Sequence, residues 1–427
     1  MLRLVYSLLL LMVIPLILLR LLVRGFRQRG YWENIRERWG RYGQAPRRTS
    51  LWIHAVSVGE MRAAQPLIDR LRLTYPGRPI VISCMTVTGR EIARELYADT
   101  VECIYLPYDF FRLHRRFIAH FKPSLLMIME TEIWPNLLAA CRAENVPAAL
   151  VSGRLSEKSR HGYARFAPVR ALIRDAMQSL GAVGAQSAAD AVRLTALGAS
   201  NPFVTGNMKF DMPVDPLLAA RGRLWRDCLD EEKRVLLAAS TRDGEEKLLL
   251  DSYRNAFSAV ERKLLLLVLV PRHPQRFDAV YKLISLAGLS NGRRSLAESP
   301  PADVEVWLGD SMGEMAAYIA LCDVAFIGGS LLPLGGQNLI EACAQGKPVI
   351  MGPSTFNFSD AARLANEAGA MRQASDADAV MRAARELLLH EDICETASQA
   401  AFAFAGAHAG ATEKTMGLIA PLLNARI

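Results

Sequence analysis

Two series of short apolar runs, each interleaved with segments of helical periodicity, constrain the fold of this chain more than any other feature. The first series lies between residues 51 and 185 and the second between 235 and 351. Short apolar runs are typical of strands buried on both faces of a parallel sheet, and the segments between them supply crossover helices. We therefore predict an α/β protein with two doubly wound, Rossmann-like domains.

The expected strands share a run of apolar residues that ends near a glycine or a polar residue. Because ligands of such sheets bind outside the carboxyl ends of the strands, we expect the two domains to face each other across a cleft. The strands of the first series are residues 51–56, 80–84, 101–105, 125–128, 148–151 and 181–185, joined by helices such as 61–74 and 91–98. Those of the second series are 235–239, 264–270, 304–307, 324–327 and 348–351.

A length of 427 residues is too great for one core and suits two domains with an accessory segment. Residues 213–232 have a helical but charged pattern without a strand, so we interpret them as a linker. The predicted parts are a membrane anchor at 1–24, a basic juxtamembrane segment at 25–49, an N-terminal domain at 50–212, the linker, and a C-terminal domain at 233–427.

The predicted anchor lies outside both series. Residues 4–19 contain no charge, and Leu21, Leu22 and Val23 continue the apolar run beyond Arg20. That length is close to the roughly 20 residues that span a bilayer. A cleavable signal peptide is the alternative, but no small-residue cleavage site follows and the basic residues lie on the wrong side of the run. We expect an uncleaved anchor, either single-pass or monotopic.

Arginines crowd the segment after the apolar run and place the bulk of the chain in the cytoplasm by the positive-inside rule. With Tyr31, Trp32, Trp39 and Tyr42 among them, they favour contact with the headgroups of inner-membrane lipids. Nucleic-acid binding is the alternative for a basic patch, but much of the net charge of +8 lies beside the anchor, so we expect no nucleic acid. The arginines are Arg20, Arg24, Arg27, Arg29, Arg36, Arg38, Arg41, Arg47 and Arg48.

The chain carries no local metal or disulfide motif. Its seven cysteines are scattered without a CxxC pair or a histidine at ligand spacing, which is typical of buried thiols in a reducing compartment. Asp376 and Asp378 form a DxD pattern that elsewhere holds a metal ion. An acidic first turn of a helix at 379–388 explains the pattern without one, and we predict neither a metal nor a cofactor.

A glycine-rich segment in the second series is the strongest signal for a ligand. It reads Gly335-Gly336-Gln337-Asn338-Leu339-Ile340-Glu341 and follows the apolar run 324–327. A glycine loop that opens a helix presents backbone N–H groups to phosphate, and a carboxylate one turn further can accept from ribose hydroxyls. A tight turn and an acid that complements the helix dipole explain the same residues without a ligand. The apolar surroundings of Glu341 favour the nucleotide-sugar interpretation.

Acidic residues follow two strands of the first series. Glu60 opens a helix, where it could act as a general base or simply complement the helix dipole. Because a helix N-terminus favours the ionised form, we expect Glu60 to have a low pKa. Glu130 and Glu132 follow the second of these strands, and we expect Thr131 or Glu132 to cap the next helix. We interpret His54 as a buried strand histidine.

Further polar segments end strands in both series. Arg154 and Lys209 follow strands of the first series together with small polar residues. In the second series, residues 240–246 form a plausible anion nest and Arg272 offers a planar cation suited to phosphate. Residues 312–314 begin a helix that precedes the glycine-rich segment.

In their order along the chain, these segments closely resemble the 3-deoxy-D-manno-octulosonic acid (Kdo) transferases of lipid A biosynthesis. The resemblance implies a GT-B architecture, CMP-Kdo as donor and a glucosamine disaccharide lipid, the lipid A precursor lipid IVA, as acceptor. It also implies a metal-independent, inverting transfer at the bacterial inner membrane. It runs through the anchor and through residues 54–60, 130–136, 154–159, 206–209, 271–274 and 336–341.

The same resemblance implies roles for individual residues. In an acceptor-binding N-terminal domain, Glu60 would take the proton from the acceptor hydroxyl, while Glu130 and Lys209 would stabilise the transition state. Charges placed where charge develops are a strong source of catalysis. In the C-terminal domain, CMP would be bound by Pro271, Arg272, Met312, Gly313, Glu314, Asn338, Leu339, Ile340 and Glu341.

Three alternatives accompany this interpretation. Another GT-B transferase that uses a different nucleotide sugar would share the fold. A membrane-tethered binding or scaffold protein would carry the same acids as helix caps. A dinucleotide oxidoreductase is disfavoured, because no G-x-G-x-x-G follows the first strand.

Overall fold

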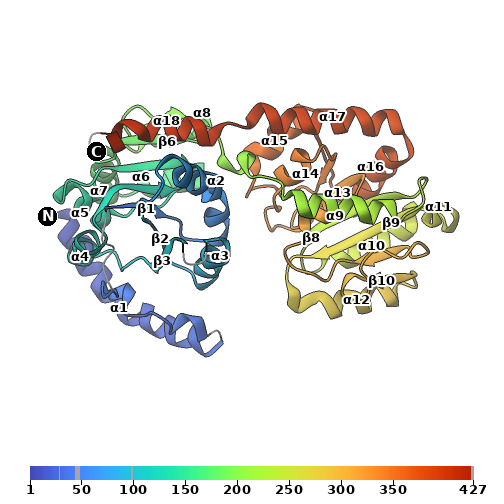
Figure 1. Ribbon diagram of the computed structural model, residues 1–427, viewed down its shortest axis with the longest axis horizontal. Helices are drawn as coiled ribbons and strands as arrows, with labels where there is room; N and C mark the ends of the chain where they lie inside the picture. Colours follow the sequence, from blue (N-terminus) through green and yellow to red (C-terminus); the bar gives the residue numbers. More distant parts are fainter. Residues whose placement is uncertain (28, 44–48, 98–99, 425–427) are drawn as a thin grey trace. The chain divides into compact units, whose positions relative to one another are not determined.

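The computed structural model in Figure 1 describes residues 1–27, 29–43, 49–97 and 100–424. The predicted basic residues Arg47 and Arg48 lie outside the described residues. The chain divides into two compact units, one comprising Met1–Met212 with Ala409–Ile427 and the other comprising Pro213–His408. Each unit contains its own parallel sheet, so the doubled α/β pattern predicted from the two apolar series is confirmed.

The first unit is built on a seven-stranded parallel sheet in the order β3-β2-β1-β4-β5-β6-β7. Every residue of β1, β2, β4 and β5 is buried, which explains why their sequences are continuous apolar runs instead of alternating patterns. The strands are β1 (Ser50–His54), β2 (Ile80–Cys84), β3 (Glu102–Tyr105), β4 (Pro123–Met129), β5 (Ala148–Gly153), β6 (Ala182–Ala185) and β7 (Phe203–Val204).

Helices cover both faces of this sheet, because successive strand residues point to opposite faces. Trp52 lies in the core completed by α4, α5, α7 and α8, whereas Leu51 and Ile53 lie in the core completed by α2, α3 and α18. The helices are α1 (Leu2–Arg27), α2 (Val58–Thr74), α3 (Val87–Tyr97), α4 (Phe111–Phe121), α5 (Pro135–Ala143), α6 (Glu157–Ala164), α7 (Ala167–Gln178), α8 (Ala188–Ala196) and α18 (Ala411–Asn424), with 3-10 turns η1 (Arg29–Tyr31), η2 (Glu37–Trp39) and η4 (Met208–Asp211).

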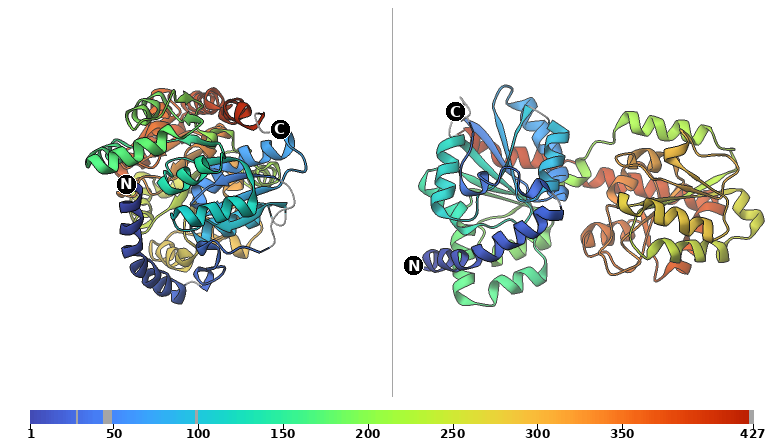
Figure 2. Two further views of the ribbon diagram at one scale, coloured as in Figure 1. Left: turned by 90° about the vertical axis from the view of Figure 1, so that its left-hand side faces the viewer. Right: turned by 90° about the horizontal axis from the view of Figure 1, so that it is seen from below.

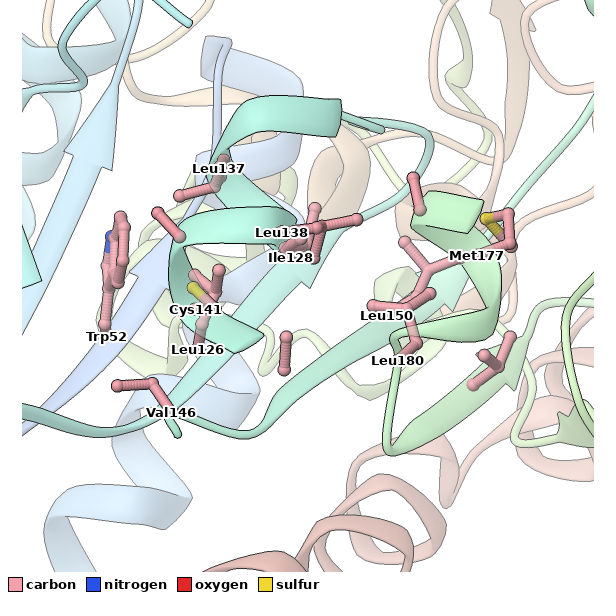
Figure 3. Packing of buried hydrophobic residues seen from close by; sticks show 14 of the residues in the cluster. Trp52, Leu126, Ile128, Leu137, Leu138, Cys141, Val146, Leu150, Met177 and Leu180 are labelled. Atoms are coloured by element: carbon pink, nitrogen blue, oxygen red, sulfur yellow. The ribbon is translucent and has the colours of Figure 1, made fainter. Parts of the chain in front are cut away.

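Figure 3 shows the core between this sheet and α5. Leu137, Leu138 and Cys141 of α5 lie in the same buried cluster as Leu126 and Ile128 of β4. Truncating a buried leucine to alanine typically costs about 2–5 kcal/mol. The packing therefore fixes the end of β4 and the start of α5, and the segment between them carries two of the acids discussed below.

The second unit repeats the architecture with a sheet in the order β10-β11-β9-β8-β12-β13-β14. Its strands are β8 (Arg234–Thr241), β9 (Leu265–Pro271), β10 (Asn291–Arg293), β11 (Val306–Leu308), β12 (Val324–Ile327), β13 (Val349–Met351) and β14 (Met371–Gln373). Its helices are α9 (Pro216–Asp227), α10 (Glu245–Ala256), α11 (Ala259–Lys263), α12 (Phe277–Leu286), α13 (Met315–Leu321), α14 (Ile340–Ala344), α15 (Ser359–Glu367), α16 (Ala377–Leu389) and α17 (Glu391–His408), with 3-10 turns η5 (Pro274–Arg276) and η6 (Arg294–Leu296).

Three strands were absent from the prediction: β7, β10 and β14. Each lies at the edge of its sheet. None of the three has more than three residues, and β7 and β10 contain no buried residue. Because an edge strand need not be apolar, it lacks the signal that identified the central strands.

The compact units differ from the predicted domains at the C-terminus. Helix α18 lies in the first unit, where Ile419 and Leu423 are completely buried in the core. Asp211 holds its start by accepting hydrogen bonds from the N–H groups of Gly410 (2.6 Å) and Thr412 (2.5 Å). Residues 409–427 therefore return to the first unit, which the apolar-run pattern did not indicate.

The segment predicted as a linker is part of the second unit. Trp225 of α9 is buried and contacts Trp307 and Tyr318, with ring centroids 5.1 and 5.2 Å away. Gly222 brings α9 close to α13, since a Cβ at this position would lie 2.2 Å from the carbonyl oxygen of Ala317. One face of this helix therefore packs against the second unit, although its many charged residues suggested an exposed linker.

Part of the predicted headgroup-binding segment is folded into the first unit. Arg38 is buried, donates to the carbonyl oxygen of Met85 (3.0 Å) and lies 4.0 Å from the ring centre of Tyr105. Glu37 forms two hydrogen bonds with Arg90, at 2.7 and 2.8 Å. Arg38 is therefore unavailable to lipid, which corrects the prediction for that residue.

The other side chains of this segment divide between the protein and its surface. Trp39 and Tyr42 are partly buried and contact the aromatic rings of Tyr108 and Phe117, whereas Arg36 and Arg41 are exposed, as are Arg20, Arg24 and Trp32. Of the seven cysteines, Cys228 is exposed and Cys394 is partly exposed, which corrects the expectation that all are buried.

Candidate functional site

The site in the first unit lies at the topological switch point of its sheet. β1 pairs with β2 on one side and with β4 on the other. In a doubly wound sheet, the residues that follow two such strands lie together at the carboxyl edge, where ligands bind. Glu60 follows β1 and Glu130 follows β4, so the topology brings together two of the acids selected from the sequence.

Glu60 lies in the first turn of α2 and its carboxylate reaches back toward β1. The backbone N–H of Val56 donates to its Oε2 at 2.6 Å, and the Ser57 hydroxyl donates to its Oε1 at 3.4 Å. Ser57 is also the N-cap of α2. Glu60 therefore has a structural role at the helix start, and its partly exposed side chain is also accessible for chemistry.

The expected low pKa of Glu60 is wrong. Burial of the side chain, to which the nearby acids Glu130 and Glu132 add, raises its pKa to about 8 and outweighs the hydrogen bond from Val56. The prediction considered only the helix dipole and omitted both the desolvation of the side chain and the acids that follow β4. A carboxyl with this pKa is protonated in most of the molecules at neutral pH, and the ionised fraction that could accept a proton increases as the pH approaches 8.

Glu130 is held in an unusual conformation. Its φ of 53° lies in the left-handed region, which is costly for a non-glycine residue and is found preferentially at functional sites. Its Oε1 accepts a hydrogen bond from Lys209 Nζ at 2.9 Å, and each side chain is 16% exposed. The ion pair joins the end of β4 to η4, so Lys209 belongs to the same cluster as the two acids.

Asp109, which the sequence did not single out, performs the capping predicted for Thr131 or Glu132. Its carboxylate accepts from the N–H groups of Asn136 (3.2 Å) and Leu137 (2.9 Å) at the start of α5. Glu132 instead accepts from the indole N–H of Trp134 at 2.9 Å. No local pattern could identify Asp109, because it caps a helix that begins more than twenty residues further along the chain.

His54 is a buried strand histidine, as predicted. It is completely buried, and its Nδ1 lies 2.9 Å from the hydroxyl of Ser83. Burial lowers its pKa to about 4, so the ring is neutral at physiological pH. Arg154, also selected from the sequence, is partly buried after β5.

The predicted anion nest at residues 240–246 is already occupied by a side chain of the protein. Glu245 is completely buried and accepts from the N–H groups of Arg242 (2.8 Å), Gly329 (2.6 Å) and Leu331 (2.9 Å). Glu246 is also buried and bonds to Thr241 at 2.9 Å. These acids organise the loops at the carboxyl edge of the second sheet, and the nest prediction is wrong.

The predicted CMP-binding segments follow three strands of the second sheet. Pro271 ends β9 and Arg272 follows it; residues 312–314 come after β11; and the glycine-rich segment comes after β12. Because these strands and β8 pair in parallel, their carboxyl ends share one edge of the sheet. Arg272 is exposed and makes no ion pair within the described part of the chain.

The glycine-rich segment forms a tight loop. Gly335 and Gly336 have φ values of 88° and 72°, and a Cβ at Gly335 would lie 2.5 Å from the ring of Phe356. Asn338 accepts from Ile340 N–H (3.1 Å) and donates to Glu341 (2.9 Å). Leu339 and Ile340 have buried side chains, so only their backbone groups are available to a ligand.

Residues 312–314 include an exposed side chain and a carboxylate that is held by two arginines. Met312 is exposed, and Gly313 has a φ of 81° with open space around its Cα. Glu314 accepts from Arg221 (2.6 Å) and Arg294 (3.0 Å). Burial opposes its ionisation, but hydrogen bonds from these arginines and from Ser311 outweigh that effect and lower its pKa.

The DxD pattern has the structural role that we predicted. Asp376 is the N-cap of α16 and accepts from Ala379 N–H at 2.7 Å, while Asp378 accepts from Ser252 at 2.5 Å. Within the described ranges, no group of three or more His, Cys, Asp or Glu side chains is arranged to hold a metal ion.

Comparison with known proteins establishes the family. Residues 33–212 match the family model of 3-deoxy-D-manno-octulosonic-acid transferase (kdotransferase). A 3-deoxy-D-manno-octulosonic acid transferase of Bordetella pertussis is 42% identical over 425 residues, which cover 96% of this chain and 97% of the relative. The chain belongs to the Kdo transferase family. A relative of the same name from Haemophilus influenzae is 35% identical over 431 residues, covering all of both chains.

A solved structure supports the fold of this Kdo transferase family member. The UDP-GlcNAc 2-epimerase from Neisseria meningitidis, bound to UDP-GlcNAc, has a TM-score of 0.61 and covers 88% of this chain and 100% of its own. At 12% sequence identity the likeness concerns the fold alone. Together with the two parallel sheets, it confirms the predicted GT-B-type architecture. The roles of the individual site residues stay predictions.

Proposed function

We propose that this Kdo transferase moves Kdo from CMP-Kdo to lipid IVA, a lipid A precursor, with inversion at the anomeric carbon and without a metal. The observation that carries the proposal is the cluster at the switch point of the first sheet. There burial raises the pKa of Glu60, the nearby Glu130 adds to this effect, and Glu130 is itself paired with Lys209. These are the three residues to which the family resemblance assigns the chemistry.

In the proposed reaction, the acceptor hydroxyl oxygen forms a bond to the anomeric carbon of Kdo. The bond from that carbon to the phosphate oxygen breaks, and CMP leaves with the electron pair. Glu60 takes the hydroxyl proton as the new bond forms. Glu130 provides a fixed negative charge where the sugar becomes positive, and Lys209 holds that carboxylate in place.

The second unit supplies the proposed donor site. Arg272 would bind the phosphate of CMP, and Asn338 and Glu341 would bind the ribose hydroxyls. Leu339 and Ile340 contribute backbone groups, while Glu314, fixed by its two arginines, orders the exposed turn at Met312 and Gly313. Pro271 restricts the backbone that carries Arg272.

Association with the cytoplasmic face of the bacterial inner membrane is also part of the proposal. α1 is long and apolar enough to cross a membrane over Leu2–Phe26. The acceptor is itself a membrane lipid, so an anchored enzyme meets it in two dimensions.

The test is transfer by the purified protein from CMP-Kdo to lipid IVA in the presence of EDTA, with mass spectrometry of the lipid and NMR of the anomeric configuration. We expect the mass of the lipid to increase by Kdo units with inverted configuration. Inhibition by UDP and not by CMP would favour a different nucleotide sugar. Binding of both substrates without transfer would favour a binding protein.

A further inference from the structure

Helix α1 contacts the first unit near both of its ends, and in the right-hand view of Figure 2 the blue helix runs beside that unit. Residues that are at least partly buried recur every three or four positions along the helix, from one end to the other. This spacing marks one face of an α-helix. They are Arg3, Tyr6, Ser7, Leu10, Ile14, Ile17, Leu18, Leu21 and Gly25.

The N-terminal end of α1 is hydrogen-bonded to the residues that fix the start of α5. The Tyr6 hydroxyl donates to Asp109 Oδ2 at 3.0 Å, and Asn136 Nδ2 donates to the Ser7 hydroxyl at 3.0 Å. Asp109 is itself buried and paired with His114 at 2.9 Å. These contacts are polar and specific, so they define how the helix is seated.

The C-terminal end of α1 is held by the same unit at a different place. Arg24 stacks over the ring of Tyr31 at 5.7 Å, and Tyr31 packs against the buried cluster of Cys84, Val87 and Tyr105. A helix of 26 residues is about 39 Å long, more than the roughly 30 Å thickness of the hydrocarbon core. A perpendicular span would place the two ends on opposite sides of the membrane, so one cytoplasmic unit could not hold both.

The outward face of α1 carries large apolar side chains along its whole length. A soluble protein rarely exposes such a continuous apolar surface. Arg20 and Arg24, both exposed, add positive charge at the C-terminal end, which complements anionic headgroups. The exposed apolar residues are Leu2, Leu4, Val5, Leu8, Leu9, Leu11, Met12, Val13, Leu16, Leu19, Leu22, Val23 and Phe26.

We propose that α1 lies in the plane of the membrane with its outward face in the cytoplasmic leaflet, and that its contacts with Asp109 and Asn136 hold residues 130–134 at the lipid surface. The occupant of the exposed face is thus the anionic bilayer and not a second protein. This inference rests on the proposed function, since it explains how a membrane lipid reaches the acid cluster of the first unit.

The location of the N-terminus tests the in-plane arrangement. A cysteine in a short uncharged extension before Met1, in a Cys228→Ser background, is treated with a membrane-impermeant maleimide. We expect labelling in inverted membrane vesicles and none in intact spheroplasts. The unaltered chain, with its exposed Cys228 in the second unit, marks the cytoplasmic side. Labelling in spheroplasts would show a span, and labelling only after detergent would place the end within the bilayer; either result overturns the proposal.

Kdo transfer measured on the same vesicles separates this inference from the proposed function. Active vesicles with a periplasmic N-terminus would contradict only the in-plane helix, whereas inactive vesicles with a cytoplasmic N-terminus would contradict only the proposed reaction.

The variant Tyr6→Phe tests the connection to residues 130–134. Losing a hydrogen bond of about 0.5–1.5 kcal/mol should raise the KM for acceptor in vesicles roughly two- to tenfold while CMP affinity stays unchanged. Tyr281→Phe, the same change in the second unit, should leave the KM unchanged. An unchanged KM in Tyr6→Phe would overturn the proposed connection.

Discussion

The carboxyl edges of the two sheets share a topology and differ in chemistry. In the first unit, three acids and Lys209 gather near the ends of β1 and β4, and burial raises the pKa of Glu60 to about 8. In the second unit, the buried Glu245 organises the loop after β12, and groups such as Arg272 and Glu341 are exposed or partly exposed. In the proposed function, one edge concentrates charge for proton transfer and the other presents groups that would recognise an anion. The proposal therefore assigns chemistry to one edge and donor binding to the other, although both belong to the same type of fold.

The variant Glu60→Gln should give the largest difference between the proposed roles of the two edges. Glutamine keeps the size and hydrogen bonding of the side chain but cannot take a proton. We expect turnover to fall about a hundred- to ten-thousandfold while CMP affinity stays unchanged. Rates measured with saturating substrates and CMP calorimetry on one preparation provide the check.

The matched control for this variant is Glu91→Gln, which neutralises an exposed acid on α3 and should retain full activity. Near-normal turnover of Glu60→Gln would end the assignment of Glu60 as base.

Arg272→Ala and Glu341→Gln alter the second edge, and we expect them to weaken CMP binding. Each removes a group that we propose binds CMP, and a lost charge-assisted hydrogen bond costs about 1.5–3 kcal/mol, roughly ten- to hundredfold in affinity. We expect CMP and CMP-Kdo binding to weaken together, as measured by calorimetry. Arg254→Ala, which alters an exposed arginine of α10, serves as the control. CMP affinities equal to that of the control would move the donor site elsewhere.

The central strands of both edges could be predicted from the sequence, whereas the contacts between them could not. Buried parallel strands such as β1 and β4 are continuous apolar runs, and the acids that follow them are visible as interruptions. The pair of Glu130 and Lys209 joins residues 79 positions apart, and Asp109 caps α5 from a distant loop. These contacts are created by strand order, which local patterns do not contain.

The pKa of Glu60 shows the same limit of local reasoning. The helix N-terminus predicts a lowered pKa, and the hydrogen bond from Val56 N–H acts in that direction. Burial acts in the opposite direction and prevails, and Glu130 and Glu132 add to it. The pKa of a carboxylate depends on all the groups packed around it, and these groups are known only from the folded structure.

The pH dependence of catalysis provides a further test of the difference between the two edges. If Glu60 must be ionised to accept a proton, kcat/KM should rise about tenfold per pH unit below its pKa and level off above about pH 8. CMP affinity, which the proposal assigns to the second edge, should be nearly constant over the same range. A rate that is level from pH 6 upward would show that Glu60 is ionised at neutral pH and contradict the raised pKa.

A further expected effect concerns stability, and its sign distinguishes two roles for Glu60. The folded-state pKa of about 8 lies above the ordinary value of 4.5. Between these values the folded protein holds a proton that the unfolded chain has lost, so the free energy of unfolding falls as pH rises. The fall is at most about 1.4 kcal/mol per pH unit.

Glutamine has no proton to lose, so Glu60→Gln removes this penalty. Relative to the unaltered protein, the thermal midpoint of the variant should therefore rise progressively from pH 5 to pH 8. An acid that only complements the dipole of α2 predicts the reverse, because its neutralisation would cost about 0.3–1 kcal/mol at neutral pH. Thermal unfolding of both proteins across this range decides the question: a variant that is less stable at pH 8 would show that the helix dipole, and not desolvation beside Glu130 and Glu132, governs the carboxylate.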